Sequence, residues 1–362
     1  MDTVAQILDR GLLDKPGLEY LLQLNDKSQQ QLFSRAACVK ESVLGNIVYF
    51  RGLIEFSNQC AKDCLYCGIR KSNLNNRRYL LSDDEIVNTA VFAHQHEYAS
   101  IVLQAGELIS DNFTRRIDML LKKIHRKTKG ELRITLSLGE QTFDTYKRWF
   151  ESGAQRYLLR IETSNKELYG MIHPKDDHHV FVNRFRSLES LKKIGSQTGT
   201  GVMIGLPFQT IGDLADDLLF MKQFEIDMVG MGPYLEHAET PLYQFRSQLW
   251  PLRERFNLSL RMIACLRILM PKINIAAATA LQAIDKMGRE KAIKAGANVI
   301  MPNITPGKYR DQYKLYDTKP CTDENADDCV ECLNIRVGLT GNKIGFGDWG
   351  DSVFFHEKAQ II

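Results

Sequence analysis

The sequence alternates between short β-rich runs and longer helix-like runs, and this alternation most limits the possible fold. The β-rich runs occupy residues 47–56, 100–104, 132–138, 156–161, 201–206, 227–231, 273–279 and 297–301. Strict alternation is typical of parallel strands joined by helical crossovers. Eight such strands predict an α/β fold of the TIM type, a complete (β/α)8 barrel. A doubly wound sheet is the competing architecture, but cysteines follow the first strand where that fold usually has a glycine-rich phosphate turn.

The same pattern predicts three parts within one domain. Residues 1–45 form an N-terminal helical segment with leucine-rich faces, and residues 46–301 hold the alternating runs of the barrel. Residues 302–362 lack the repeat and form a C-terminal extension. The sequence has no Pro/Ser-rich linker or internal repeat that would suggest separate domains.

Composition narrows the class of protein. Hydrophobic residues make up 44% of the 362 residues and charged residues 25%, as in ordinary globular proteins. The net charge of +3 gives no basic excess of the kind found in nucleic-acid-binding proteins. No apolar run reaches 18 residues, and the first residues lack the basic-then-apolar pattern of a signal peptide. We therefore expect a cytoplasmic protein with no nucleic-acid or membrane partner.

Six of the eight cysteines fall in two tight groups, and the first group follows the first predicted strand. Its members, Cys60, Cys64 and Cys67, have the spacing C-x3-C-x2-C. Three thiolates on one loop suit a 4Fe–4S cluster, in which the fourth iron would keep the open position of a catalytic site. A zinc knuckle is the alternative, but it would need a fourth Cys or His nearby.

With Tyr66 in the aromatic place, this loop resembles the C-x3-C-x-aromatic-C motif of the radical S-adenosylmethionine (SAM) enzymes. The resemblance implies a 4Fe–4S cluster and SAM as cofactors, together with an external electron donor. It also implies reductive cleavage of SAM into methionine and a 5′-deoxyadenosyl radical.

Polar residues collect where the predicted strands end, which is where barrel enzymes build their active sites. Arg160 and Glu162 are two residues apart on one strand and share a face, so they would direct a charged pair into the barrel mouth. A zwitterion such as SAM could satisfy both charges. The alternative is a buried ion pair that only stabilises the top of the barrel.

The second cysteine group and a tyrosine-rich stretch follow the barrel. Cys321, Cys329 and Cys332 lie in an acidic segment and suggest a second iron–sulfur cluster, with three free surface cysteines as the alternative. The spacing of Tyr309, Tyr313 and Tyr316 predicts one helical face, which either packs on the barrel or covers its mouth. The pair His178–His179 is predicted to lie in an ordinary solvated loop.

Longer segments resemble the HydE-type maturases of FeFe-hydrogenase along nearly the whole chain, with biotin synthases and methylornithine synthases (PylB) as more distant relatives. The second cysteine group also looks like the accessory cluster that some members carry. The matching segments are residues 54–58, 60–68, 102–107, 135–140, 156–163, 205–207, 227–230, 296–303 and 348–350.

The resemblance implies a set of ligand-contacting residues. Those implied to contact SAM are Tyr66, Ser137, Glu162, Arg184 and Met301. Those implied to line the substrate cavity are Gln104, Thr135, Arg160, Thr279, Tyr313 and Tyr316. Ala105, Ile161 and Ala278 stand where other members can carry serine, histidine and threonine, which leaves the substrate open.

The implied reaction is a step in assembling the di-iron part of the hydrogenase H-cluster. The substrate would be an iron–cysteine complex bearing CO and cyanide, supplied by the maturase HydG, with HydF as a further partner. Two alternatives stay open. One is a radical SAM enzyme of the biotin synthase and methylornithine synthase group that acts on a small organic substrate, and the other is a non-catalytic iron–sulfur carrier.

Overall fold

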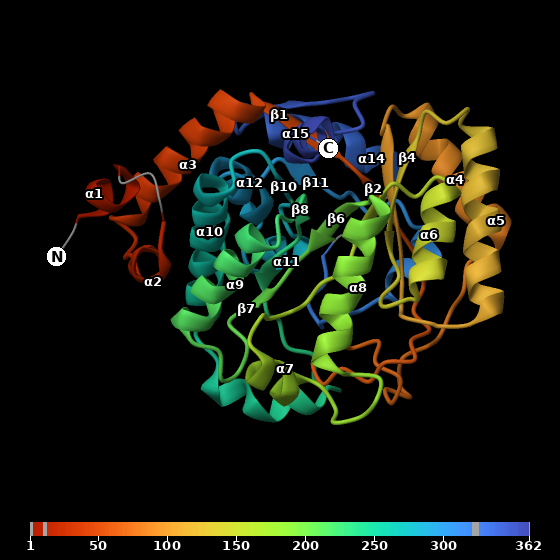
Figure 1. Ribbon diagram of the computed structural model, residues 1–362, viewed down its shortest axis with the longest axis horizontal. Coiled ribbons are helices and arrows are strands. Elements are labelled where there is room, and N and C mark those ends of the chain that lie inside the picture. The colour runs from red at the N-terminus through yellow and green to blue at the C-terminus, as the bar shows by residue number, and fades with distance from the viewer. Residues whose placement is uncertain (1–2, 10–12, 321–325, 362) are drawn as a thin grey trace.

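The structure is a computed structural model that describes residues 3–9, 13–320 and 326–361. Three helices form the N-terminal segment: α1 (Val4–Asp9), α2 (Lys15–Leu22) and α3 (Gln29–Leu44). Helix α2 packs on α9, and α3 packs on α10 (Figure 1). The segment therefore lies against one side of the strand-and-helix body.

Seven parallel strands form one curled sheet in the order β10–β8–β6–β5–β4–β3–β2. Strands that follow one another in the chain are neighbours in space, as helical crossovers dictate. The register places Ile54, Leu103 and Leu136 side by side, and all three are fully buried. The strands are β2 (Gly52–Ser57), β3 (Ser100–Ala105), β4 (Arg133–Ser137), β5 (Arg156–Leu158), β6 (Gln197–Thr200), β8 (Met228–Val229) and β10 (Asn274–Ile275).

The two edges of this sheet approach each other through short strands. Strand β1 (Ile47–Phe50) leads into β2 and pairs with β11 (Val299–Ile300) and β12 (Lys343–Ile344). Parallel bridges join Ala276 to Val299 and Leu53 to Asn303. A further pair, β7 (Met203–Ile204) and β9 (Gly232–Pro233), continues β6 and β8. The expectation of an α/β fold built from parallel strands is confirmed.

Helices cover the outer face of the sheet (Figure 1). Side-chain caps start several of them, because Ser and Thr oxygens accept bonds from otherwise unpaired N–H groups. The capping residues are Ser82, Ser110, Thr142 and Thr210. The covering helices are α4 (Asp83–Gln95), α5 (Asp111–Lys127), α6 (Phe143–Glu151), α8 (Phe181–Ile194), α9 (Ile211–Gln223), α10 (Leu252–Leu269) and α12 (Gly288–Lys294).

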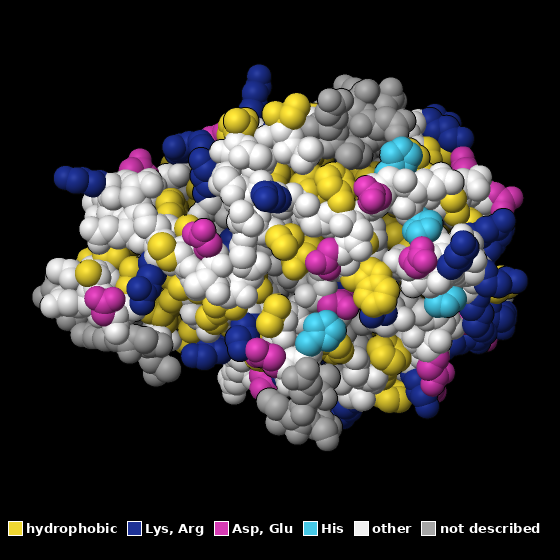
Figure 2. All heavy atoms as spheres, turned by 90° about the horizontal axis from the view of Figure 1, so that it is seen from above, with side chains coloured by type: hydrophobic (Ala, Val, Ile, Leu, Met, Phe, Trp, Pro, Cys, Tyr) yellow, Lys and Arg dark blue, Asp and Glu magenta, His cyan; other side chains and the backbone are white. Residues whose placement is uncertain are grey.

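The two ends of the sheet carry different segments. The loop after β2 lies at the lower end in Figure 1, together with α7 (Lys166–Ile172) and the 3-10 helix η1 (Pro241–Gln248). Helices α14 (Ala326–Gly338) and α15 (Val353–Ile361) lie at the upper end. Figure 2 looks onto that upper end and shows charges of both signs scattered among hydrophobic side chains.

Buried hydrogen bonds fasten the C-terminal extension to the upper ends of the strands. Arg156 pairs with Asp351, and Arg51 and Asn274 both donate to the carbonyl of Gly350, at 3.0 and 2.9 Å. Arg156, on β5, is therefore tied to the end opposite the loop after β2, whereas Arg160 follows β5. Within the described ranges, no helix has the length and apolar character needed to cross a bilayer.

Three expectations about local structure are wrong. The tyrosine stretch does not form one helical face, because α13 (Gly307–Arg310) is a single turn and Tyr313 lies in the loop that follows. The seventh run stops being a strand at Ile275, and Thr279 begins α11 (Thr279–Ile284) after three alanines, which favour strands poorly. The fifth strand begins at Gln197, earlier than the apolar pattern indicates.

Candidate active site

Cys60, Cys64 and Cys67 lie on the connection between β2 and α4, at the lower end of Figure 1. All three are free and half-buried. Burial, with a smaller contribution from the neighbouring Cys60, raises the pKa of the Cys64 thiol to about 12, although Arg184 opposes this shift. A thiolate needs compensation by positive charge in such surroundings, and a bound metal supplies it.

The end of β3 holds this cysteine loop in place. The backbone N–H of Glu107 donates to Cys60 Sγ at 3.3 Å, and Ala61 N donates to the Glu107 carbonyl at 2.8 Å. A Cβ atom on Gly106 would come within 2.3 Å of the Gln59 carbonyl oxygen. Only glycine permits this close approach of β3 to the loop.

A buried network of four charged side chains lies beside the cysteine loop. Lys62 Nζ lies 3.1 Å from Glu107 and 3.0 Å from Glu140. Arg184 Nε lies 2.7 Å from Glu140, and its Nη2 atom lies 3.7 Å from Glu107. The two cations and two carboxylates balance, which makes their burial tolerable.

The network shifts the proton affinities of its members. Burial raises the pKa of Glu107, although Arg184 and Lys62 oppose this shift. The pKa of Arg184 lies well above its usual value, because Glu140 and Glu107 outweigh the effect of burial. Arg184 is therefore a permanent cation, 8% exposed, on the first turns of α8.

Arg160 and Glu162 follow β5 and form an ion pair of 3.0 Å. Glu162 has a φ of 64°, unusual for a residue with a side chain, and a bridge to Val202 holds this backbone. Burial raises the pKa of Glu162, although Arg160 lowers it. The charged pair expected from the sequence therefore exists, and its carboxylate is largely buried.

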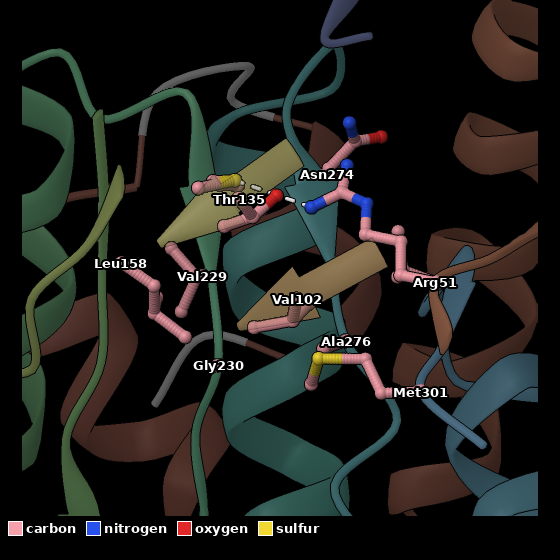
Figure 3. A pocket seen from close by; sticks show the side chains of 11 residues that line it. Arg51, Val102, Thr135, Leu158, Val229, Gly230, Asn274, Ala276 and Met301 are labelled. Atoms are coloured by element: carbon pink, nitrogen blue, oxygen red, sulfur yellow. Dashed lines mark hydrogen bonds between the residues drawn. The ribbon is translucent and has the colours of Figure 1, made fainter. Parts of the chain in front are cut away.

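Thr135, expected in the substrate cavity, and Met301, expected to contact SAM, line one small cavity among the strands. The side chains of Thr135 and Met301 point into it together with Arg51 (Figure 3). The cavity has a volume of about 20 Å³, enough for about one water molecule. Among the described residues, the hydroxyl of Thr135 has no hydrogen-bond partner.

Arg51 was missed in the sequence, although it is a charge within the first β-rich run. Its Nη1 atom lies 3.2 Å from the sulfur of Met228, drawn as a dashed line in Figure 3. Burial holds the pKa of Arg51 well below its usual value. A lone arginine inside an apolar run was the signal that could have identified it.

The other expected residues occupy several places around the lower end of the strands. Gln104 Nε2 donates to the hydroxyl of Tyr313 at 3.2 Å, and Ser137 pairs in register with Gln104. Thr279 and Tyr316 are half-buried in the segments after β10 and α13.

Tyr66 stacks edge-on against His173, with ring centroids 5.4 Å apart. His179 was predicted to be a solvated loop residue, but it is 6% exposed, so that prediction is wrong. Lys62, Glu107 and Glu140 received no role from the sequence, because nothing local shows that they meet.

The second cysteine group is only partly covered by the described residues. Cys332 is exposed on α14, whereas Cys321 and the side chain of Cys329 lie outside the described residues. Helix α14 lies at the end opposite the first cysteine loop (Figure 1). In the part of the chain described, no three His, Cys, Asp or Glu side chains are arranged around one metal ion. The cysteines of a 4Fe–4S cluster need no such arrangement, since each binds a different iron.

Comparison with known proteins identifies the family. The sequence profile of the radical SAM superfamily matches residues 54–221, from β2 to α9. The chain is 42% identical over 348 residues to the [FeFe] hydrogenase maturase subunit HydE of Thermotoga maritima, covering 96% of each protein. The chain belongs to the HydE family of radical SAM enzymes. This family membership confirms the resemblance read from the cysteine loop and the longer motifs.

Membership makes the chain an enzyme of a superfamily that cleaves SAM reductively with a 4Fe–4S cluster. This HydE-family chain is also 29% identical to the 3-methylornithine synthase of Methanosarcina acetivorans, over 82% of the chain and 81% of that protein. Its fold is similar to the crystal structure of methylornithine synthase (PylB), with a TM-score of 0.79 and 23% identity over 99% of both chains.

Proposed function

We propose that the chain is an FeFe-hydrogenase maturase that uses SAM to act on an iron–cysteine complex bearing CO and cyanide. The observation that carries this proposal is the 42% identity to HydE over 96% of both proteins. The sequence departures at Ala105, Ile161 and Ala278 concern the substrate cavity, so the identity of the substrate is the part most in need of a test.

Cys60, Cys64 and Cys67 would hold the 4Fe–4S cluster. Their fit rests on three clustered thiols and on the Glu107 N–H that points at Cys60 Sγ, since hydrogen bonds to sulfur tune such clusters. When bound, the cluster supplies one electron for cleaving the sulfonium bond of SAM. The protein contributes the narrow approach at Gly106 and half-buried surroundings.

The charged network fits the amino-acid part of SAM. Arg184 would bind the carboxylate, and Glu107 and Glu140 would accept hydrogen bonds from the ammonium group. Because the network is neutral, a zwitterion can enter it without leaving a net buried charge. Three further residues, Tyr66, Ser137 and Met301, would contact other parts of SAM, and Glu162 would hold the ribose.

The substrate would lie deeper among the strands. Arg160 is 36% exposed at its side chain and could form charge-assisted bonds to an anionic complex. Thr135 offers a hydroxyl without a partner among the described residues, and Gln104 is joined to Tyr313. Thr279 and Tyr316 would complete the cavity.

We infer that the strands close into a complete (β/α)8 barrel around this cavity. The pairing of β1 with β11 and the bridge from Ala276 to Val299 support closure, because together they connect β10 to β2. A closed barrel would surround a radical on all sides and exclude side reactions.

The remaining parts of the proposal concern the second cysteine group and the partners. Cys321, Cys329 and Cys332 would bind an accessory iron–sulfur cluster. Replacing all three with alanine should lower the iron content and spare SAM cleavage; complete loss of cleavage in a folded variant would contradict this role. HydG and HydF are the proposed partners, with an external electron donor, in the cytoplasm.

Release of 5′-deoxyadenosine in the presence of SAM and a reductant tests the chemistry. We expect release from the wild type and none from Cys64→Ala, because Cys64 supplies one of only three protein ligands. Normal release of 5′-deoxyadenosine from Cys64→Ala would refute the cluster assignment. No release from the reconstituted wild type would favour a non-catalytic iron–sulfur carrier.

Hydrogenase activation in a mixture with HydG and HydF tests the substrate. Activation that depends on this protein supports the maturase. The 29% identity to 3-methylornithine synthase makes a small organic substrate the second candidate, and formation of 3-methylornithine without hydrogenase activation would favour it.

A further inference from the structure

The connection between α7 and α8, residues 173–180, lies against the cysteine loop. Leu65 N donates to the carbonyl of Ile172 at 3.1 Å, at the end of α7. Lys62 Nζ donates to the carbonyl of His178, and Asp63 N donates to His179 Nε2 at 3.1 Å. The chain on both sides of Cys64 is thus tied to the end of α7 and to the connection that follows it.

His179 makes the contact that depends most on a particular side chain. Its Nδ1 atom lies 2.7 Å from Asp176 Oδ1, so this nitrogen carries a proton and donates it to the carboxylate. Nε2 is then the unprotonated nitrogen, as it must be to accept the N–H of Asp63. Asp176 therefore fixes the tautomer with which His179 holds the residue just before Cys64.

The same connection leads directly to the charged network. Helix α8 begins at Phe181, and Arg184 on its first turn reaches Glu140 at 2.7 Å. Lys62, within the cysteine loop, reaches the same carboxylate at 3.0 Å. The segment from His179 to Arg184 thus joins the backbone of the cysteine loop to the proposed site for the carboxylate of SAM.

We propose that His179 is a positioning residue that sets the cysteine loop relative to Arg184, and so sets the cluster relative to SAM. This inference rests on the proposed function, because it needs a cluster at Cys64 and SAM at Arg184. The side chain of His179 is hydrogen-bonded to Asp63 and Asp176 rather than to Cys64 or Arg184. It acts through the Asp63 N–H, which is one peptide unit away from Cys64.

The test compares three variants of the full-length, reconstituted protein. His179→Leu removes the acceptor, and His179→Gln keeps a side-chain oxygen that can accept the Asp63 N–H. His178→Leu is the matched control, since that side chain is exposed and its backbone carbonyl stays. Iron and sulfide content, the EPR spectrum of the reduced cluster with and without SAM, and SAM affinity by calorimetry are measured for each.

We expect all variants to bind the normal amount of iron. In His179→Leu, the change that SAM causes in the EPR spectrum should shrink, and SAM should bind about three- to tenfold more weakly, the loss of about one hydrogen bond. His179→Gln should recover most of the EPR change and most of the SAM affinity. His178→Leu should match the wild type in both measurements.

An unchanged EPR response and SAM affinity in His179→Leu would overturn the inference, and so would an equal loss in His178→Leu. If His179→Leu does not fold, Asp176→Ala provides the same test, because it removes the acceptor that fixes the tautomer. Failure of the wild type to assemble a SAM-responsive cluster would instead refute the proposed function. The two failures are thus distinguishable.

Discussion

Asp217 on α9 makes folding stability depend on pH in a direction opposite to most carboxylates. It is 0% exposed, and its Oδ1 atom accepts bonds from Ser164 N and Ser164 Oγ, both at 2.6 Å. Burial raises its pKa to about 7, although Ser164 opposes this shift. Ser164 follows the Arg160–Glu162 segment closely, so Asp217 supports the backbone that carries Glu162.

The sign and size of the effect follow from this pKa. An unfolded aspartate titrates near the usual value of 3.8, so the folded protein binds the extra proton between about pH 4 and pH 7. The stabilisation is present in full below that window and is lost as the pH rises through it. At about 1.4 kcal/mol per pKa unit, the loss from about pH 5 to pH 8 is about 3 kcal/mol.

Asp217→Asn tests this reasoning, because an amide resembles the protonated acid and does not titrate. The free energy of unfolding is measured by urea titration at about pH 5 and at about pH 8. Its decrease from the lower to the higher pH should be about 3 kcal/mol smaller in the variant than in the wild type. Asp177→Asn is the control, since that aspartate is exposed. Equal pH dependence in wild type and Asp217→Asn would refute the assignment.

Three further predictions concern the lower end of the strands. Lys62→Met should lower the free energy of unfolding by about 3–5 kcal/mol, because it leaves two buried carboxylates with one cation. The control is Lys71→Met, on the surface of the same loop, which should lower it by under about 0.5 kcal/mol. Gly106→Ala should reduce iron loading, because the added methyl group meets backbone at 2.3 Å; normal iron content would contradict this. Arg160→Leu should weaken hydrogenase activation more than SAM binding, whereas Glu162→Gln should weaken SAM binding more than hydrogenase activation. Equal losses of SAM affinity in the two variants, measured by calorimetry, would show that Arg160 and Glu162 form only a structural ion pair.

The strand pattern and the cysteine loop were predictable because their signals are local. The alternation of β-rich and helix-like runs predicted parallel strands. The spacing of Cys60, Cys64 and Cys67 indicated a radical SAM enzyme. The end of the seventh strand and the tyrosine helix were mispredicted for the same reason, since periodicity over a few residues cannot distinguish one helical turn from a loop. Thr279 and Tyr313 consequently belong to other elements than expected.

What the sequence determined by itself is the chemistry that one loop can support. Cys60, Cys64 and Cys67 are close because the chain between them is short, so their spacing alone indicates a shared metal site. Only the tertiary structure decided which charges surround that loop. Lys62 and Arg184 come from a loop and a helix far apart in the chain, and both meet Glu140 because parallel strands deliver their following segments to one end of the sheet. The fold buries these four charged side chains together, and there they form a balanced network. No local sequence pattern indicates that they are buried.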